Sequence, residues 1–114
     1  MWEMQKRIGD FDRQRFQSLG PGYLALSLAG EAGELANFMK KIWRKHPSVG
    51  DRDGFAAIDD SDRARIADEL ADVVMLAVVL ANHLSIDIDD ELARKLRLIG
   101  ERLEAGYYGA EGRA

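Results

Sequence analysis

Cysteine is absent from this 114-residue chain, and basic residues are outnumbered by acidic ones, 16 to 20. Without cysteine the chain has no disulfide, no thiolate metal ligand and no cysteine nucleophile. Its formal net charge of −4 provides no broad basic surface, so we do not expect nucleic acid as a partner. Walker A and G-x-G-x-x-G sequences are also missing, which excludes the glycine-rich loops that commonly bind phosphate.

Long hydrophobic runs are missing as well. The longest, Val73–Ala81, has nine residues, whereas a membrane-spanning helix needs about 20. The amino end, Met1–Lys6, carries an acid and an amide where a signal peptide needs an apolar core. We therefore expect a cytoplasmic protein that does not enter a membrane.

The length and composition indicate one globular domain over residues 1–114. A chain of this size can bury a single modest core, and its 46% hydrophobic and 32% charged residues are typical of a folded domain. The core is expected to extend over about residues 2–105. The tail, residues 106–114, contains three glycines and is expected to be flexible.

The spacing of apolar residues predicts an all-α fold. We expect helices over residues 2–18, 23–45 and 61–84, and a last helix that begins at Asp87 or Asp89 and ends near Gly106. Gly20–Gly22 separates the first two helices, and residues 47–60 form a loop. Ser61 is the expected N-cap of the third helix. Together the four helices would form a bundle.

Carboxylates are the main candidates for chemistry. Two acid pairs, each with a spacing of three residues, lie in the predicted second and third helices: Glu31 with Glu34, and Glu69 with Asp72. Residues three apart share one face of a helix, so each pair points in one direction. Both pairs lie in or beside apolar stripes, where four like charges would repel one another and lose hydration. A divalent cation would compensate, and oxygen ligands suit Mg²⁺ or Mn²⁺ rather than zinc.

The residues around these acids resemble two motifs of a known family. Gly30–Asn37, followed by Lys40–Ile42, resembles the first metal motif of the MazG-like family. Asp68–Val74 resembles its second motif, E-L-x-D-V, and the similarity extends from Leu24 to Arg102. Members of this family are all-α nucleoside triphosphate pyrophosphohydrolases. The resemblance implies a Mg²⁺-dependent enzyme that cleaves an NTP or dNTP between the α and β phosphates, giving a nucleoside monophosphate and pyrophosphate.

The same reasoning assigns roles to single side chains. Four acids are both the expected metal ligands and the expected catalytic residues: Glu31, Glu34, Glu69 and Asp72. They would hold two or three Mg²⁺ ions, with Mn²⁺ as a substitute, and Glu34 or Glu31 would accept the proton of the attacking water. Four polar or basic residues are the expected substrate-binding residues: Asn37, Lys41, Lys95 and Arg102. An apolar pocket for the base would be lined by residues of the first two helices, for which the candidates are Phe11, Phe16, Tyr23 and Ser27.

The third helix predicts self-association. Its run Val73–Ala81 is apolar on all sides, and a helix of this kind is buried on all sides. Four helices from one short chain cannot easily cover it, so a homodimer or homotetramer is expected. The family resemblance implies the same, because MazG-like enzymes are dimers or tetramers.

Two alternatives remain open from the sequence. The chain could be a non-catalytic interaction module whose acids form salt bridges with Lys41, Lys95 and Arg102. It could also be an enzyme like phosphoribosyl-ATP pyrophosphohydrolase, which shares the helical plan. Neither histidine belongs to a Glu-x-x-His sequence, so a di-iron bundle is excluded, and His83 is expected at a helix end or an interface.

Overall fold

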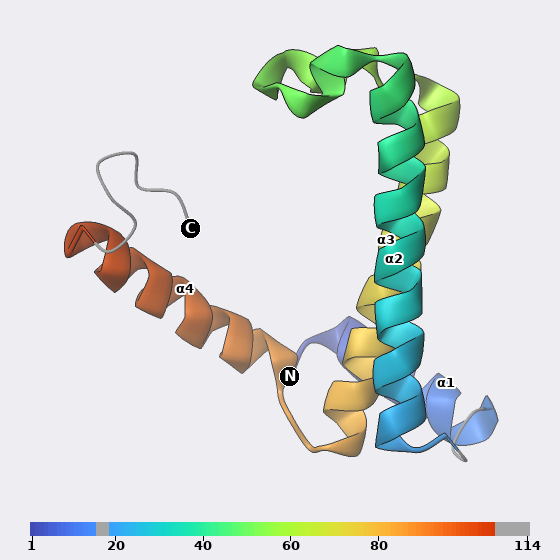
Figure 1. Ribbon diagram of the computed structural model, residues 1–114. Helices are drawn as coiled ribbons and strands as arrows, with labels where there is room; N and C mark the ends of the chain where they lie inside the picture. Colours follow the sequence, from blue (N-terminus) through green and yellow to red (C-terminus); the bar gives the residue numbers. More distant parts are fainter. Residues whose placement is uncertain (16–18, 107–114) are drawn as a thin grey trace.

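The computed structural model describes residues 1–15 and 19–106, and every regular element in them is helical. Two short 3₁₀ helices connect α2 to α3 (Figure 1). In chain order the elements are α1 (Glu3–Arg15), α2 (Pro21–Lys45), η1 (Pro47–Gly50), η2 (Arg52–Ala57), α3 (Asp60–His83) and α4 (Ile88–Glu104). The all-α prediction is confirmed for these residues. The predicted end of the first helix near Ser18 and the tail from residue 107 lie outside the described residues.

The two long helices α2 and α3 run antiparallel, side by side (Figure 1). The 3₁₀ segment lies at one end of this pair, and α1 packs against α3 near the other end. α2 ends at Lys45, as predicted, because a residue that precedes a proline is disfavoured in the α conformation. This antiparallel pairing sets the middle of α2 opposite the middle of α3.

The start of α3 and the segment before it differ from the sequence prediction. The N-cap is Asp59 rather than Ser61: Oδ1 of Asp59 accepts a hydrogen bond of 2.8 Å from the backbone N–H of Asp62. The predicted loop also contains the two 3₁₀ helices. These pack so closely that a Cβ atom at Gly54 would lie 2.2 Å from the carbonyl oxygen of Ser48, which explains the glycine. For α4, Asp87 is the N-cap and accepts from the N–H groups of the next turn.

The hydrophobic core lies where α1, α2 and α3 meet. Its buried members are Ile8, Leu24, Val78 and Val79, with Leu19, Leu76 and Leu80 packed against them. Each fully buried aliphatic side chain contributes about 1.5–3 kcal/mol relative to an exposed one. The core therefore fixes one end of the α2–α3 pair, while the other end extends beyond it.

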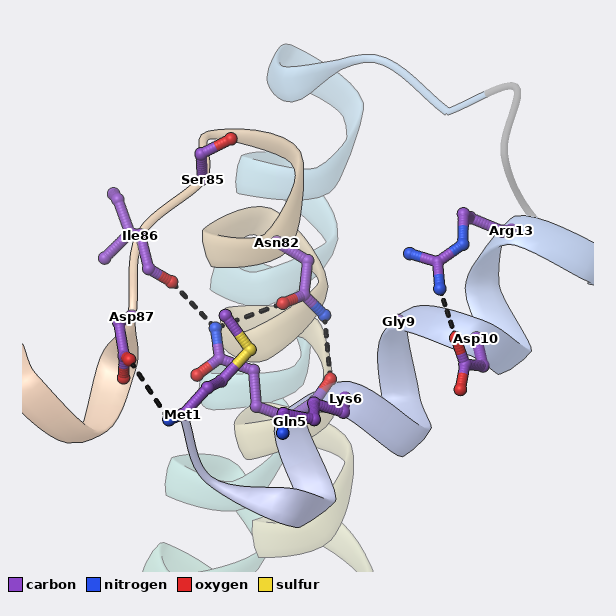
Figure 2. A pocket seen from close by; sticks show the side chains of 10 residues that line it. All are labelled: Met1, Gln5, Lys6, Gly9, Asp10, Arg13, Asn82, Ser85, Ile86 and Asp87. Carbon is purple, nitrogen blue, oxygen red and sulfur yellow. Dashed lines mark hydrogen bonds and ion pairs between the residues drawn. The ribbon is translucent and has the colours of Figure 1, made fainter.

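A buried amide fastens α1 to the turn between α3 and α4 (Figure 2). The side chain of Gln5 is fully buried, and its Nε2 donates to Oδ1 of Asn82 at 3.1 Å and to the carbonyl oxygen of Ile86 at 2.7 Å. Oε1 of Gln5 accepts from the N–H of Ile88 at 3.0 Å. Asn82 in turn donates to the backbone carbonyl of Gln5. These bonds satisfy buried polar groups on both sides and fix the position of α1.

The apolar run Val73–Ala81 occupies the C-terminal half of α3 and is covered on one side. Val78, Val79 and Ala81 are buried, whereas Val74 and Met75 are each 47% exposed. Among the described residues, no single helix has both the length and the apolar composition of a membrane span. α3 and α4 meet these two criteria together, as a pair bent by 107°.

The last helix departs from the predicted bundle. α4 leaves the α2–α3 pair and extends away from it (Figure 1). Two of its leucines are largely exposed, Leu92 at 57% and Leu96 at 72%. The four α-helices therefore do not close into a bundle within one chain.

Candidate metal centre

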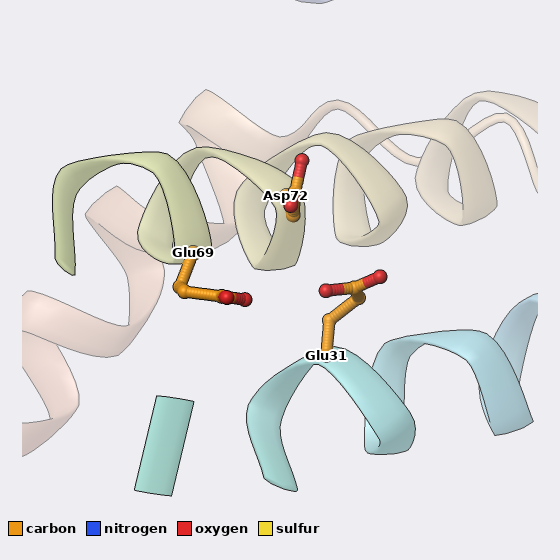
Figure 3. A group of neighbouring side chains, drawn as sticks. All are labelled: Glu31, Glu69 and Asp72. Carbon is orange, nitrogen blue, oxygen red and sulfur yellow. The ribbon is translucent and has the colours of Figure 1, made fainter. Parts of the chain in front are cut away.

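Carboxylates from α2 and α3 converge at the middle of the helix pair. Glu31 of α2 points across to Glu69 and Asp72 of α3 (Figure 3). One carboxylate oxygen from each of the three lies within 4.8 Å of the others. The i, i+3 spacing aligns Glu69 with Asp72, and the antiparallel packing supplies Glu31 from the opposite side. Three of the four acids predicted from the sequence are thus brought together.

Two oxygens of this cluster are buried without a partner. Glu69 is only 7% exposed, and Glu31 is half-buried. Oε2 of each has no hydrogen-bond partner in the structure. Buried anionic oxygens without a donor are costly, and a cation removes that cost. The donor set of three carboxylates, two of which have a buried oxygen without a partner, fits a hard divalent cation such as Mg²⁺.

The fourth acid, Glu34, is exposed and lies outside the three-oxygen cluster, but it acts on Glu31. Burial raises the pKa of the Glu31 carboxyl above its ordinary value of 4.5, and the negative charges of Glu34, Asp72 and Glu69 raise it further. A hydrogen bond between Glu31 and Glu34 contributes in the same direction. The acids therefore behave as one electrostatic group around Glu31.

A single cation, Arg65, contacts the cluster among the described residues. Its Nε lies 3.5 Å from Oε1 of Glu69, one turn further along α3. The guanidinium also lies over the ring of Phe38, 4.7 Å from the ring centre, and this contact ties α3 to α2. Arg65 is mostly exposed, so this one pair compensates the negative charge of the cluster weakly.

A cavity of about 270 Å³ adjoins the cluster. Glu31 and Asp72 line it together with a third acid, Asp12, and its remaining wall is apolar: Leu19, Leu24, Met75, Leu76 and Val79. The base-pocket candidates Phe11, Tyr23 and Ser27 do not line this cavity, and Phe16 lies outside the described residues. The predicted pocket was lined by the first two helices, whereas this cavity is also lined by residues of α3, namely Asp72, Met75, Leu76 and Val79.

The four predicted substrate-binding residues are not gathered at the cluster within one chain. Asn37 is exposed on α2. Lys41 lines a separate cavity of about 230 Å³, near the end of α2, with Asp59 and Asp62. Lys95 and Arg102 belong to α4, which points away from the acids (Figure 1).

Sequence reasoning missed the pair formed by Asp12 and His83. Nε2 of His83 donates to Oδ2 of Asp12 at 2.8 Å, across α1 and α3, and Asp12 is 4% exposed. The position of Asp12 in the sequence could have indicated that it is buried, because it lies four residues after Ile8 and therefore on the inner face of α1. His83 was expected at a helix end, and it is the last residue of α3.

The raised pKa of Glu31 predicts how the stability of the metal-free protein depends on pH. Between pH 4.5 and the folded-state pKa, the native chain holds the Glu31 proton more tightly than the unfolded chain does. The free energy of unfolding should therefore fall as the pH rises through that interval. Glu31→Gln should lack this fall and should be the more stable protein at pH 8. Denaturant titrations with chelator across pH 4 to 8 measure the free energy of unfolding of both proteins. Asp68→Asn, which changes an exposed acid of α3, is the control. A parallel pH dependence in wild type and Glu31→Gln would contradict the electrostatic coupling.

The comparisons with known proteins identify a family. The model of the MazG-like family matches residues 36–106, a range that includes Glu69 and Asp72 of α3 and begins after Glu31 and Glu34 of α2. The chain is 34% identical over 93 residues to the "Gene 37 protein" of Mycobacterium phage L5, an alignment that covers 82% of this chain and 75% of the phage protein. No solved structure matches the chain significantly. With more than half of its length matched by the family model and a phage relative across most of its length, the chain belongs to the MazG-like family.

Proposed function

We propose that this protein is a Mg²⁺-dependent nucleoside triphosphate pyrophosphohydrolase that cleaves an NTP or dNTP between the α and β phosphates. The observation that carries the proposal is the group of three carboxylate oxygens within 4.8 Å, two of whose residues have a buried oxygen without a partner. Membership of the MazG-like family supports the reaction class.

Glu31, Glu69 and Asp72 would hold the metal, with Mn²⁺ as a substitute for Mg²⁺. When bound, the ion would neutralise charge on the triphosphate and acidify the attacking water. In the proposed step a water molecule attacks the α-phosphorus and its proton passes to Glu34, the acid beside Glu31 that lies outside the cluster. The bond from the α-phosphorus to the bridging oxygen breaks, and pyrophosphate leaves with the electron pair. The other product is a nucleoside monophosphate.

The interaction-module alternative requires cations that neutralise the acids. In the described part of the chain, Arg65 is the cation that contacts the cluster, and it is neither Lys41 nor Lys95. Two buried oxygens are left without a donor. A salt-bridged module would satisfy these oxygens, so the geometry favours the metal enzyme.

A second copy of the chain would complete the site and cover the apolar surfaces. Val74 of α3 and Leu92 and Leu96 of α4 are exposed in one chain. Exposed apolar surface of this kind often marks a site of protein–protein contact. We propose a homodimer or homotetramer in which these faces of α3 and α4 are buried. In such an assembly α4 of one copy can approach the acids of another, and Lys95 and Arg102 would join the site in this way.

The proton acceptor and one metal ligand can be tested by substitutions that keep side-chain shape. Glu34→Gln removes the proton acceptor, and Asp72→Asn removes a ligand charge. Each should lower pyrophosphate release by about 100-fold or more while the fold is retained, because charge is removed where the reaction needs it. Pyrophosphate release from a panel of NTPs and dNTPs, with Mg²⁺ and with chelator, measures this. Asp68→Asn, an exposed acid next to Glu69, is the matched control. Turnover that survives in chelator or in both variants would exclude the mechanism.

The assembly predicts a solution mass at a multiple of 12.7 kDa. Leu96→Glu should shift that mass toward the single chain, because a carboxylate would be buried without a partner at the interface. Arg97→Glu, one position further along the exposed surface of α4, should leave the mass unchanged. Light scattering at micromolar concentration measures both. A wild-type mass of 12.7 kDa would show that the apolar faces are not covered by a second copy.

A further inference from the structure

The carboxylate of Asp12 is buried and only half satisfied. It is 4% exposed, and its Oδ2 accepts a hydrogen bond of 2.8 Å from His83. Its other oxygen, Oδ1, is buried without a partner. Asp12 is not part of the three-oxygen cluster. A buried acceptor that no protein group satisfies, outside the metal centre, calls for a donor from elsewhere.

Asp12 lines two cavities of about 270 Å³ each. One of them contains His83, which already holds Oδ2 of Asp12, so a donor for Oδ1 would lie in the other, the cavity that Asp12 shares with the acids of the cluster. Glu31 and Asp72 line the same cavity, so a nucleotide whose triphosphate lies at these acids could place another part of the molecule in the cavity. Its apolar wall includes Leu24, Leu76 and Val79. A mostly apolar lining with a few convergent polar groups is typical of a small-molecule pocket, and the faces of an aromatic base would be buried against such a lining. Because Oδ2 is bound to His83, the oxygen available to a ligand is Oδ1.

The chemistry of Oδ1 limits which nucleobases fit. A carboxylate oxygen accepts hydrogen bonds and repels carbonyl oxygens. Cytosine and adenine carry an exocyclic amino group, which donates two N–H bonds. Uracil and thymine carry a carbonyl oxygen at the corresponding position, and their ring N–H lies between two carbonyl oxygens. A buried carboxylate therefore favours an amino-bearing base, because the carbonyl-bearing base leaves the acceptor unpaired and adds repulsion.

We infer that this cavity binds the nucleobase and that Asp12 selects bases with an exocyclic amino group, with His83 as the residue that positions the Asp12 carboxylate. The inference rests on the proposed function for its substrate, a nucleoside triphosphate. It adds a specificity-determining residue on α1, a helix that contributes no acid to the metal centre.

The matched pair dCTP and dUTP tests the inference. The wild-type protein should hydrolyse dCTP with a kcat/KM at least about tenfold above that for dUTP, since a hydrogen bond to a charged group discriminates by roughly this factor. Asp12→Asn should lower that ratio by about tenfold, because an amide can turn its NH₂ group toward a carbonyl oxygen. Asp10→Asn, which removes an exposed acid from the same helix, should leave the ratio unchanged. If Asp12 only fastens α1 to α3 through His83, Asp12→Asn will lower stability without changing the ratio, and the inference is wrong.

Binding of monophosphates separates this inference from the proposed reaction and does not need a stable variant. Calorimetry with chelator should show that wild-type protein binds dCMP more tightly than dUMP. Equal binding, or tighter binding of dUMP, would overturn the base preference even if triphosphates are hydrolysed. A dCMP preference without any pyrophosphate release would retain the pocket and exclude the proposed reaction.

Discussion

Packing of α2 against α3 forces like charges together, and the rest of the site depends on this constraint. The antiparallel pair sets Glu31 opposite Glu69 and Asp72, with oxygens within 4.8 Å. Burial and mutual repulsion raise the pKa of Glu31, and two buried oxygens have no donor. The core formed with α1 supplies stability at one end of the pair, and Arg65 over Phe38 adds a contact between the helices near the acids. The fold thus holds a destabilised anionic group in place, which is what a binding site for a divalent cation requires.

Much of this arrangement could be predicted from local sequence. The apolar spacing gave the four helices, and the breaks at Pro47 and near Pro21 follow from the conformational limits of proline. The acid pairs could be recognised because residues three apart share a helix face. The local pattern did not predict the correct N-cap of α3, because two residues could serve as the cap. Asp59 caps the helix instead of Ser61, since the Asp59 side chain accepts a hydrogen bond from the N–H of Asp62. The local pattern also failed for the 3₁₀ helices, whose close approach at Gly54 depends on tertiary packing.

Features that depend on distant segments could not be predicted in this way. The Asp12 and His83 side chains are 71 positions apart, and no periodicity connects them. The placement of α4 could not be predicted from the sequence pattern either. The apolar face of an amphipathic helix indicates that this face is covered, but it does not indicate which segment or chain covers it. Lys95 and Arg102 accordingly remain predictions for the site. One cavity is lined by Asp12 of α1 together with Glu31 of α2 and Asp72 of α3, a connection that no motif indicated.

Direct binding of Mn²⁺ tests the central claim, that the carboxylates of α2 and α3 form one metal site. Electron paramagnetic resonance can count the ions bound by the full chain without substrate or turnover. Glu69→Gln should weaken Mn²⁺ binding by at least about tenfold, because it removes a charge from the most buried ligand. Asp68→Asn, which changes the exposed neighbouring acid, should bind as the wild type does. Equal Mn²⁺ affinity in the wild type and Glu69→Gln would contradict the account.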